Sequence, residues 1–386
     1  MLTPTQTAKT RQSLLIGLSV VVVAVTNIQL ASLIASGGGP YQQADWLINL
    51  AAGQIRRGWF GEAMFALANA TGASPLHLVG AVQSVLTTLV IAAVALASVR
   101  FRNSQTVFVL VASPTVLLFW FNDLGGAFRK ELLVYAAFVP LLFPEFQRTR
   151  WAAAIVLLAY LAAVVGHEGN IFLAPALAFT LYHVQTGRQR RLLAGCVVGL
   201  AAIGGAYAAM YMSIPSSAPI CLKITSSGLD DNLCTGIVKW LELDASGVRS
   251  RNEFAVARNY FGFIAVMLGA LAPVAILCVI AARHGDRRPI VAMLFCSLPI
   301  LPLFVLAIDW GRWLSMGSFT FVLVTLSLYA GSKPAWLDSP LPKTWFAVIV
   351  IYNLTVGCSH FEGTPIPGPL AMIWNSGLQL VVGSGV

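Results

Sequence analysis

Residues 121–131 read Phe121-Asn122-Asp123-Leu124-Gly125-Gly126-Ala127-Phe128-Arg129-Lys130-Glu131, a charged segment between two apolar runs that predict membrane-spanning helices. Ionisable side chains at membrane depth are energetically expensive, so such a segment indicates a functional site. Three further charged segments occur at the ends of apolar runs: Gly166-His167-Glu168-Gly169-Asn170, Asp309-Trp310-Gly311-Arg312-Trp313 and Ser359-His360-Phe361-Glu362. We expect all four segments to lie on the same side of a membrane and to carry the chemistry of the protein.

The composition excludes a soluble protein. Of the 386 residues, 58% are hydrophobic and only 10% are charged, and the mean hydropathy is +0.79. These values predict an all-α, polytopic integral membrane protein in which residues 1–386 form a single transmembrane domain. The net charge of +9 does not indicate nucleic-acid binding, because most basic residues fall in short loops, where they set the membrane topology.

The apolar runs predict about eleven or twelve membrane-spanning helices and a cytoplasmic N-terminus. Lys9 and Arg11 precede the first run, which we interpret as an uncleaved helix because no small-residue cleavage site follows it. Every predicted inner loop is basic, as the positive-inside rule requires. The predicted helices cover residues 13–35, 75–99, 104–121, 131–143, 151–166, 170–185, 192–213, 259–282, 289–308, 313–331, 344–358 and 369–382.

Two predicted outer segments are long enough to hold structure of their own. Residues 36–74 predict two amphipathic helices, over 42–56 and 60–70, lying along the membrane surface. Residues 213–258 are polar and contain Cys221 and Cys234, whose spacing suits a disulfide in an oxidising compartment. Two free thiols are the alternative interpretation.

The depth of the charged segments follows from counting outward from the basic inner loops at ~1.5 Å per residue, across a core of roughly 30 Å. His167 lies about 17 residues from Arg150, or roughly 25 Å, and His360 lies equally far from Lys343. The charged segments therefore converge near the outer interface. Because charges are cheaper in one shared wet cavity than against lipid, we expect them to form one site.

Arg129 and Lys130 are candidates for a phosphate clamp. Arginine offers planar bidentate donors to a phosphate or diphosphate, and lysine adds a point charge. The alternative is that both side chains extend to the outer headgroups with Glu131 as a local partner. Arg56 and Arg57 form a second candidate clamp, whose alternative is interfacial anchoring.

The segment 309–313 combines a carboxylate, an arginine and flat aromatic faces, a mixture that sugar-binding sites favour. Trp310 and Trp313 are the aromatic candidates. The alternative is a local ion pair between Asp309 and Arg312, flanked by tryptophans of the membrane interface.

The candidate general bases begin with His167 and Glu168, because an adjacent carboxylate can raise the basicity of an imidazole. His360 repeats the combination with Glu362, and Asp45 is an isolated acid in the first outer segment. No paired-cysteine or paired-histidine metal spacing and no glycine-rich nucleotide loop occurs, so we predict no metal and no cofactor.

The many-helix layout, with the segment 125–131 opening a helix and outward Arg, His and acidic residues, resembles the Wzy/EpsG-type polysaccharide polymerases of bacterial envelopes. The resemblance implies an inner-membrane enzyme with the architecture of multispanning GT-C glycosyltransferases. It would join undecaprenyl-diphosphate-linked repeat units at the periplasmic face, with a chain-length regulator as a partner. The sequence departs from that pattern in its second outer segment, which holds few arginines: Arg249, Arg251 and Arg258.

The resemblance implies a mechanism in which arginines hold the lipid diphosphate while a base activates the acceptor hydroxyl. The predicted substrate-binding residues are Arg56, Arg57, Arg129, Lys130, Trp310, Arg312, Trp313 and His360. The candidate catalytic residues are Asp45, Glu131, His167, Glu168 and Asp309. Two alternatives remain, a GT-C transferase that uses a polyprenyl-phosphate sugar with Asp45 as base, and a transporter or flippase for an anionic lipid or solute.

Overall fold

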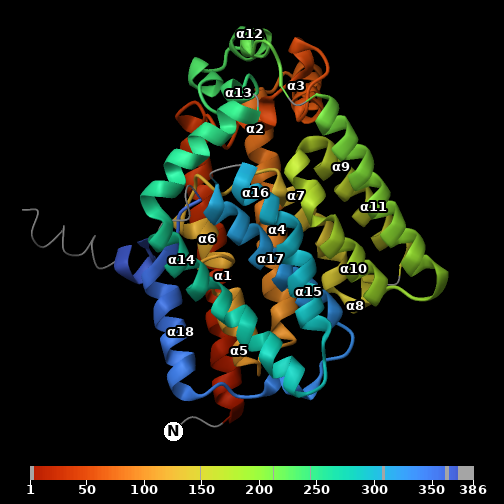
Figure 1. Ribbon diagram of the computed structural model, residues 1–386, viewed down its shortest axis with the longest axis vertical. Coiled ribbons are helices and arrows are strands. Elements are labelled where there is room, and N and C mark those ends of the chain that lie inside the picture. Colours follow the sequence, from red (N-terminus) through yellow and green to blue (C-terminus); the bar gives the residue numbers. More distant parts are fainter. Residues whose placement is uncertain are drawn as a thin grey trace, which may run out of the picture.

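The computed structural model describes residues 4–147, 149–211, 213–243, 245–306, 309–360 and 365–372. These residues are mostly helical, which confirms the all-α class (Figure 1). One small antiparallel sheet pairs β1, Val356–Cys358, with β2, Pro365–Pro367. Strand β1 directly follows the last long helix, α18 (Lys343–Thr355), and His360, two residues beyond β1, lies beside Gly125 and Gly126 of the charged segment.

Five helical segments among the described residues are long and apolar enough to cross a membrane. They lie in α1 (Pro4–Ala35), α4 (Pro75–Val99), α11 (Gly187–Met210), α14 (Ala245–Arg283) and the continuous run of α15 (Arg288–Ser297), η5 (Leu298–Ile300) and α16 (Leu301–Leu306). Their many exposed leucine, valine and isoleucine side chains are typical of helices that face lipid. The chain is therefore an all-α protein with the helices that membrane association requires.

Several of the other predicted helices are shorter than expected or divided. The predicted helix over 104–121 is wrong as a single element, because α5 (Gln105–Val111) and α6 (Leu117–Asn122) flank a turn that contains Pro114. The remaining elements follow the predicted order: α7 (Glu131–Phe138), η2 (Val139–Leu142), α8 (Pro144–Gln147), α9 (Arg150–Gly166), η3 (Glu168–Leu173), α10 (Ala174–Val184), α17 (Trp310–Leu328), η6 (Ala335–Asp338) and α18 (Lys343–Thr355). The predicted helix over 369–382 lies outside the described residues beyond 372.

Helix α17 forms the centre of the molecule (Figure 1). It is buried from Trp310 to Ser327 and contacts α4, α7, α10, α14 and α15. A helix surrounded by protein on all sides can carry polar residues without exposing them to lipid. Because Arg312 lies in its first turn, α17 holds this charge inside the helical bundle.

The first outer segment departs from its prediction. A helix over 42–56 is wrong: this stretch forms α2 (Ala44–Leu47) and the short η1 (Leu50–Ala52), and α2 is completely buried instead of lying on the membrane surface. The Asn49 side chain accepts the Ala51 N–H at 3.0 Å and caps the start of η1, and Arg57 turns the chain with a left-handed φ of 68°. Helix α3 (Gly58–Thr71) agrees with the prediction over 60–70.

The second outer segment packs on the first at the end of the molecule opposite the N-terminus (Figure 1). It contains α12 (Ala218–Ser226), η4 (Asp231–Cys234) and α13 (Ile237–Trp240). The Ile237 N–H donates to the Pro40 carbonyl at 3.0 Å, and a side chain on Gly236 would collide with that same carbonyl. The two outer segments therefore form one layer over the bundle.

The disulfide predicted between Cys221 and Cys234 is not formed in this structure, where both residues are free thiols. The two half-buried side chains are neighbours. Burial, followed by the adjacent Cys221 thiol, raises the pKa of the Cys234 thiol to about 12. The two cysteines are thus adjacent, as their spacing predicted, but they are not joined by a disulfide in this structure.

Candidate functional site

The first outer segment is joined to the α9–α10 connection by a network of ion pairs around Glu168. The Arg57 Nε donates to the two Glu168 carboxylate oxygens at 2.8 and 3.0 Å, and the Arg56 Nη1 lies 2.7 Å from Oε1. On its other side, Arg57 Nη1 lies 3.5 Å from Asp45 Oδ1. The fully buried Lys130 Nζ donates to the Arg57 carbonyl at 3.2 Å and lies 4.0 Å from Asp45 Oδ1. We call these five residues the latch network.

The latch network corrects two predicted roles. Arg56 and Arg57 are neither membrane anchors nor free phosphate donors, because Glu168 occupies the donor groups that face it. The Lys130 ammonium is likewise committed to Arg57 and Asp45 and is not directed at the outer headgroups. Ion pairs of this kind act first as a structural connection between elements far apart in the chain.

The acids of the latch network lie in connections outside the membrane-spanning helices, and both are held in their ionised form. Burial alone would raise the pKa of Asp45, but the charges of Lys130 and Arg57 outweigh it and lower this pKa to about 2. Burial is likewise outweighed at Glu168, where Arg57 and Arg56 hold the pKa of the carboxyl well below its usual range. Both groups are therefore weak bases.

The predicted increase in the basicity of His167 is wrong. Burial in the connection after α9, followed by the charge of Arg57, lowers the pKa of His167 to about 4 despite the neighbouring Glu168. The His167 Nδ1 accepts the Gly169 N–H at 2.8 Å, so the neutral ring carries its hydrogen on Nε2. His167 thus caps the start of η3 as a neutral residue.

A second group of charges surrounds the first turns of α7 and α17. The Arg312 Nη1 lies 2.7 Å from Asp309 Oδ2, which shows that the local ion pair is present, and its guanidinium stacks 4.1 Å from the Trp313 ring centroid. On the other side, Arg312 Nε lies 3.4 Å from Glu131 Oε1, yet these two atoms share no hydrogen bond. Arg312 therefore lies between two carboxylates and forms a close ion pair with Asp309 but only a longer one with Glu131.

Arg129 approaches the same region from the segment that precedes α7. Its Nη1 donates to the Tyr41 carbonyl at 2.6 Å, and its guanidinium lies 5.7 Å from the centroid of the Tyr41 ring. The backbone of Phe128 just before it has a left-handed φ of 58°, and its carbonyl accepts from Trp46 Nε1 and Gln83 Nε2, each at 2.8 Å. This turn fixes the direction of the Arg129 side chain into the bundle.

A small cavity lies between α6, the segment 126–130, α7 and α17. Its polar wall is formed by Arg129, Glu131 and Arg312, which are 5%, 4% and 7% exposed. Each of the three keeps one buried atom without a hydrogen-bond partner: Arg129 Nε, Glu131 Oε1 and Arg312 Nε. The remaining lining residues are Phe119, Trp120, Gly126, Ala127, Phe128, Leu132, Tyr135 and Ser315. We call this space the arginine cavity.

The pair Asp123–His360 borders the same turn. His360 is a predicted substrate-binding residue, whereas Asp123 was not among the candidates, although it is the first charged residue of the segment 121–131. The His360 Nδ1 lies 2.8 Å from Asp123 Oδ2, and the Gly126 N–H donates to Oδ1 at 3.3 Å. A Cβ on Gly125 would lie 2.1 Å from the His360 ring, so only glycine allows this approach. His360 therefore fixes the turn before Arg129, whereas Phe361 and Glu362 lie outside the described residues.

Trp310 does not face the arginine cavity, so its predicted contact with a sugar has no support in this structure. Its Nε1 donates to the Phe304 carbonyl at 2.9 Å, and its ring packs on Phe263. Trp313 is covered by the Arg312 guanidinium. The aromatic residues that do line the arginine cavity include Trp120 and Tyr135.

The sequence predicts that Arg129, His167, Glu168, Asp309 and Arg312 form one site. The structure divides their close ion pairs between the latch network around Glu168 and the group around Arg312. Asp309 interacts with both Arg312 and Arg129 as well as Arg57, and Arg57 in turn binds Glu168 beside His167. Among the described residues of this region, the cations are Arg56, Arg57, Arg129, Lys130 and Arg312, and the acids are Asp45, Asp123, Glu131, Glu168 and Asp309. These formal charges balance, which explains how so many ionisable groups can be buried together.

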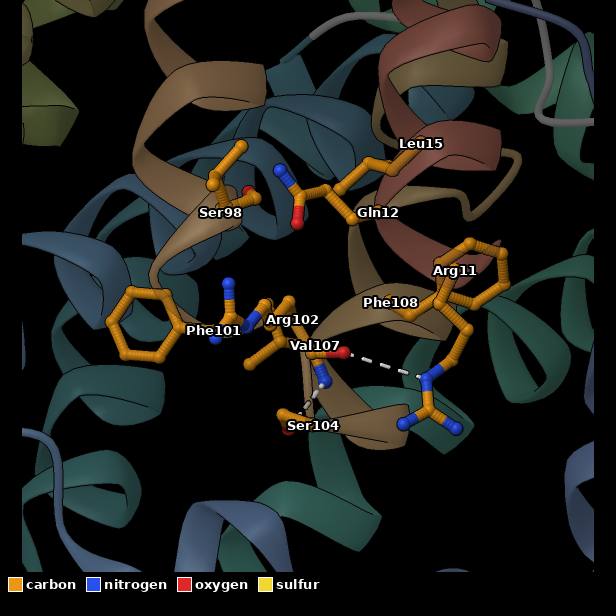
Figure 2. Close-up of a pocket in the computed structure, with 10 residues that line it drawn as sticks. Arg11, Gln12, Leu15, Ser98, Phe101, Arg102, Ser104, Val107 and Phe108 are labelled. Carbon is orange, nitrogen blue, oxygen red and sulfur yellow. Dashed lines mark hydrogen bonds between the residues drawn. The ribbon is translucent and has the colours of Figure 1, made fainter. Parts of the chain in front are cut away.

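A second cavity lies at the opposite end of the molecule, between α1, the end of α4 and α5 (Figure 2). Arg11 donates from Nε to the Arg102 carbonyl at 3.5 Å and from Nη2 to the Asn103 carbonyl at 3.1 Å. The guanidinium thus binds the turn after α4 and stabilises it, so we assign this cavity no chemistry.

No protein-family model, curated protein or solved structure matches the chain. Among the described residues, no group of three or more His, Cys, Asp or Glu side chains is placed to hold a metal ion. Arg129, Arg312 and Glu131 of the arginine cavity are therefore the residues that point most directly to a function.

Proposed function

We propose that the chain is a glycosyltransferase of the polymerase type in the bacterial inner membrane. It joins undecaprenyl-diphosphate-linked oligosaccharide repeat units at the periplasmic face during cell-surface polysaccharide synthesis, with a chain-length regulator as a partner. One observation carries the proposal: Arg129 and Arg312, 183 positions apart by number, meet at one buried cavity, and each keeps an unpartnered Nε–H. Buried donors of this kind favour an anionic ligand.

The proposed reaction transfers a glycan from its lipid diphosphate to an acceptor hydroxyl. The acceptor oxygen forms a bond to the anomeric carbon while the bond between that carbon and the diphosphate oxygen breaks. A carboxylate takes the hydroxyl proton, and the lipid diphosphate leaves with the bonding electron pair. Fixed guanidinium groups of Arg129 and Arg312 stabilise the charge that develops on the leaving group.

The latch network supports this role indirectly. It joins the first outer segment to the α9–α10 connection. Lys130 belongs to this network, and its neighbours in the chain, Arg129 and Glu131, line the arginine cavity. Moreover, Asn170 donates to the Lys130 carbonyl at 3.3 Å, which fixes the start of α7. The ion pairs thus hold the arginine cavity in shape, as preorganised catalytic groups require.

The alternative of a polyprenyl-phosphate sugar transferase with Asp45 as base is less well supported, because Asp45 is 1% exposed and paired with Lys130 and Arg57. A specific observation favours a transporter as the second candidate. The helices α5–α6 and α15–α16 are interrupted, as helices that line a transport path often are. Movement of a labelled lipid diphosphate across vesicles without any glycosyl transfer would establish that alternative.

The test uses Arg129→Ala, Arg129→Lys, Arg312→Ala and Arg312→Lys, with Arg100→Ala at the opposite end of the molecule as the matched control. Loss of one clamp arginine should remove about 2–4 kcal/mol of transition-state stabilisation, or roughly a hundredfold or more in rate. Lysine should restore little activity, because the bidentate geometry is lost. Polymer length and amount are measured on gels and normalised to the protein in the membrane.

Full-length polymer from well-expressed alanine variants at both positions would refute the phosphate clamp. The Arg100→Ala control should retain polymer, because Arg100 is partly exposed and pairs with Glu145. If an arginine had only a structural role, its replacement by alanine would lower the amount of protein in the membrane, and its replacement by lysine would largely restore function.

A further inference from the structure

We propose that Glu131 is the general base that accepts the proton of the acceptor hydroxyl. This inference rests on the proposed glycosyl transfer and assigns the one role that the sequence left open among five residues. It is carried by the position of Glu131 on the wall of the arginine cavity and by the bonding state of every competing group.

Three competing carboxylates are occupied by donors. Glu168 receives hydrogen bonds from Arg56 and Arg57, and Asp309 lies 2.7 Å from Arg312 Nη1. Asp123 is bound by His360 and by the Gly126 N–H. Donors of this kind stabilise the ionised carboxylate and make it a weaker base, and none of these three residues lines the arginine cavity.

The other two candidates are badly placed. The His167 Nδ1, its acceptor nitrogen, already accepts the Gly169 N–H at 2.8 Å. Asp45 keeps one unpartnered oxygen, Oδ2, but it does not line the arginine cavity and faces the cations of the latch network. Neither group lines the cavity that Arg129 and Arg312 share.

Glu131 combines the features that the others lack. It is the first residue of α7 and forms the cavity wall together with Tyr135, one helical turn further on. Its Oε1 is buried without a hydrogen-bond partner, and the nearest cationic nitrogen, Arg312 Nε, lies 3.4 Å away without donating to it. An entering hydroxyl can therefore donate to this oxygen without displacing an existing bond.

The same geometry separates the base from the leaving group. Arg129 and Arg312 line the same cavity as Glu131, and each keeps a buried Nε–H without a hydrogen-bond partner. During transfer, the proton moves from the acceptor oxygen to Glu131, and the diphosphate leaves towards the arginines. The protonated Glu131 then returns its proton to water.

The test uses the full chain in phospholipid nanodiscs with a lipid-diphosphate-linked repeat unit as donor. We expect Glu131→Gln to lower the transfer rate a hundredfold or more, the usual contribution of a general base. Its dissociation constant for the donor should change by less than about threefold, because the arginines are intact. Formate should restore part of the activity of Glu131→Ala, since a small carboxylate can occupy the vacated space.

Glu62→Gln is the matched control, because Glu62 is a partly exposed outer-segment acid paired with Lys223 outside the arginine cavity. Its transfer rate should equal that of the wild-type chain. Rapid transfer by Glu131→Gln, or a Glu131→Ala variant that formate leaves inactive, would overturn the assignment of the base. Loss of donor binding by Arg129→Ala and Arg312→Ala in the same assay would leave the proposed function standing. Absence of transfer by the wild-type chain would overturn both.

Discussion

Replacing Glu168 by Gln should destabilise the protein more than any exposed ion-pair change. The substitution keeps the shape of the side chain but removes the negative charge that Arg56 and Arg57 share at 2.7 and 2.8 Å. Breaking a buried ion pair on one side costs about 3–5 kcal/mol, because the remaining charge stays buried without its partner. Glu168 and the two arginines are 11–17% exposed at their side chains, so water reduces this penalty to about 3 kcal/mol.

The measurement is thermal unfolding of the purified protein in detergent, followed by tryptophan fluorescence. At about 2 °C per kcal/mol for a large chain, Glu168→Gln should lower Tm by about 6 °C. The control is Glu145→Gln, whose carboxylate pairs with Arg100 at 3.2 Å but is 68% exposed. An exposed pair contributes at most about 1 kcal/mol, so this control should shift Tm by about 2 °C or less. Equal shifts for the two variants would refute the interpretation of Glu168 as the centre of a buried network.

Two further predictions test the outer layer and the start of α17. Because the folded pKa of Asp45 is about 2 and its usual value is 3.8, its stabilising contribution is complete above pH 3.8 and disappears as the pH falls towards 2. Unfolding measured in acid should therefore show a steeper loss of stability for the wild-type chain than for Asp45→Asn, and parallel curves would contradict this. Gly311→Ala should reduce Tm and membrane abundance, because the added Cβ would lie 1.7 Å from the Ser359 carbonyl oxygen. The control is Gly195→Ala, which has open space around it and should be neutral or stabilising by about 0.5–1 kcal/mol. Similar effects at both sites would show that the contact at Gly311 is unimportant.

The limits of sequence reasoning are clearest at His167 and Arg57. The sequence shows that His167 adjoins a carboxylate, which alone would raise its basicity, but the fold brings Arg57 from the first outer segment onto the same carboxylate. The arginine charge and burial reverse the expected effect. Likewise, Arg56 and Arg57 match a phosphate clamp in sequence, and only the contact with Glu168, 111 positions from Arg57, shows that they are already paired.

The order and approximate bounds of the helices could be predicted because each depends on local hydropathy, and α4 (Pro75–Val99) agrees with its predicted range at both ends. The turn at Pro114 and the short α2 were not predicted as such, since an apolar run does not show where packing divides a helix. Asp123 was available in the sequence, but its partner His360 lies 237 positions away.

The sequence by itself therefore determined the class of the protein: a chain this apolar must form helices that satisfy their backbone hydrogen bonds internally, and its few charges must cluster. Counting along the helices also indicated that these charges lie at one level, because the rise per residue is fixed. Only the tertiary structure decided which charges pair with each other and which keep an unpartnered atom at a cavity. Pairing depends on distances and directions of a few ångströms between segments far apart in the chain. The latch network closes into ion pairs around Glu168, whereas Arg129, Glu131 and Arg312 line one cavity, each with an unpartnered atom.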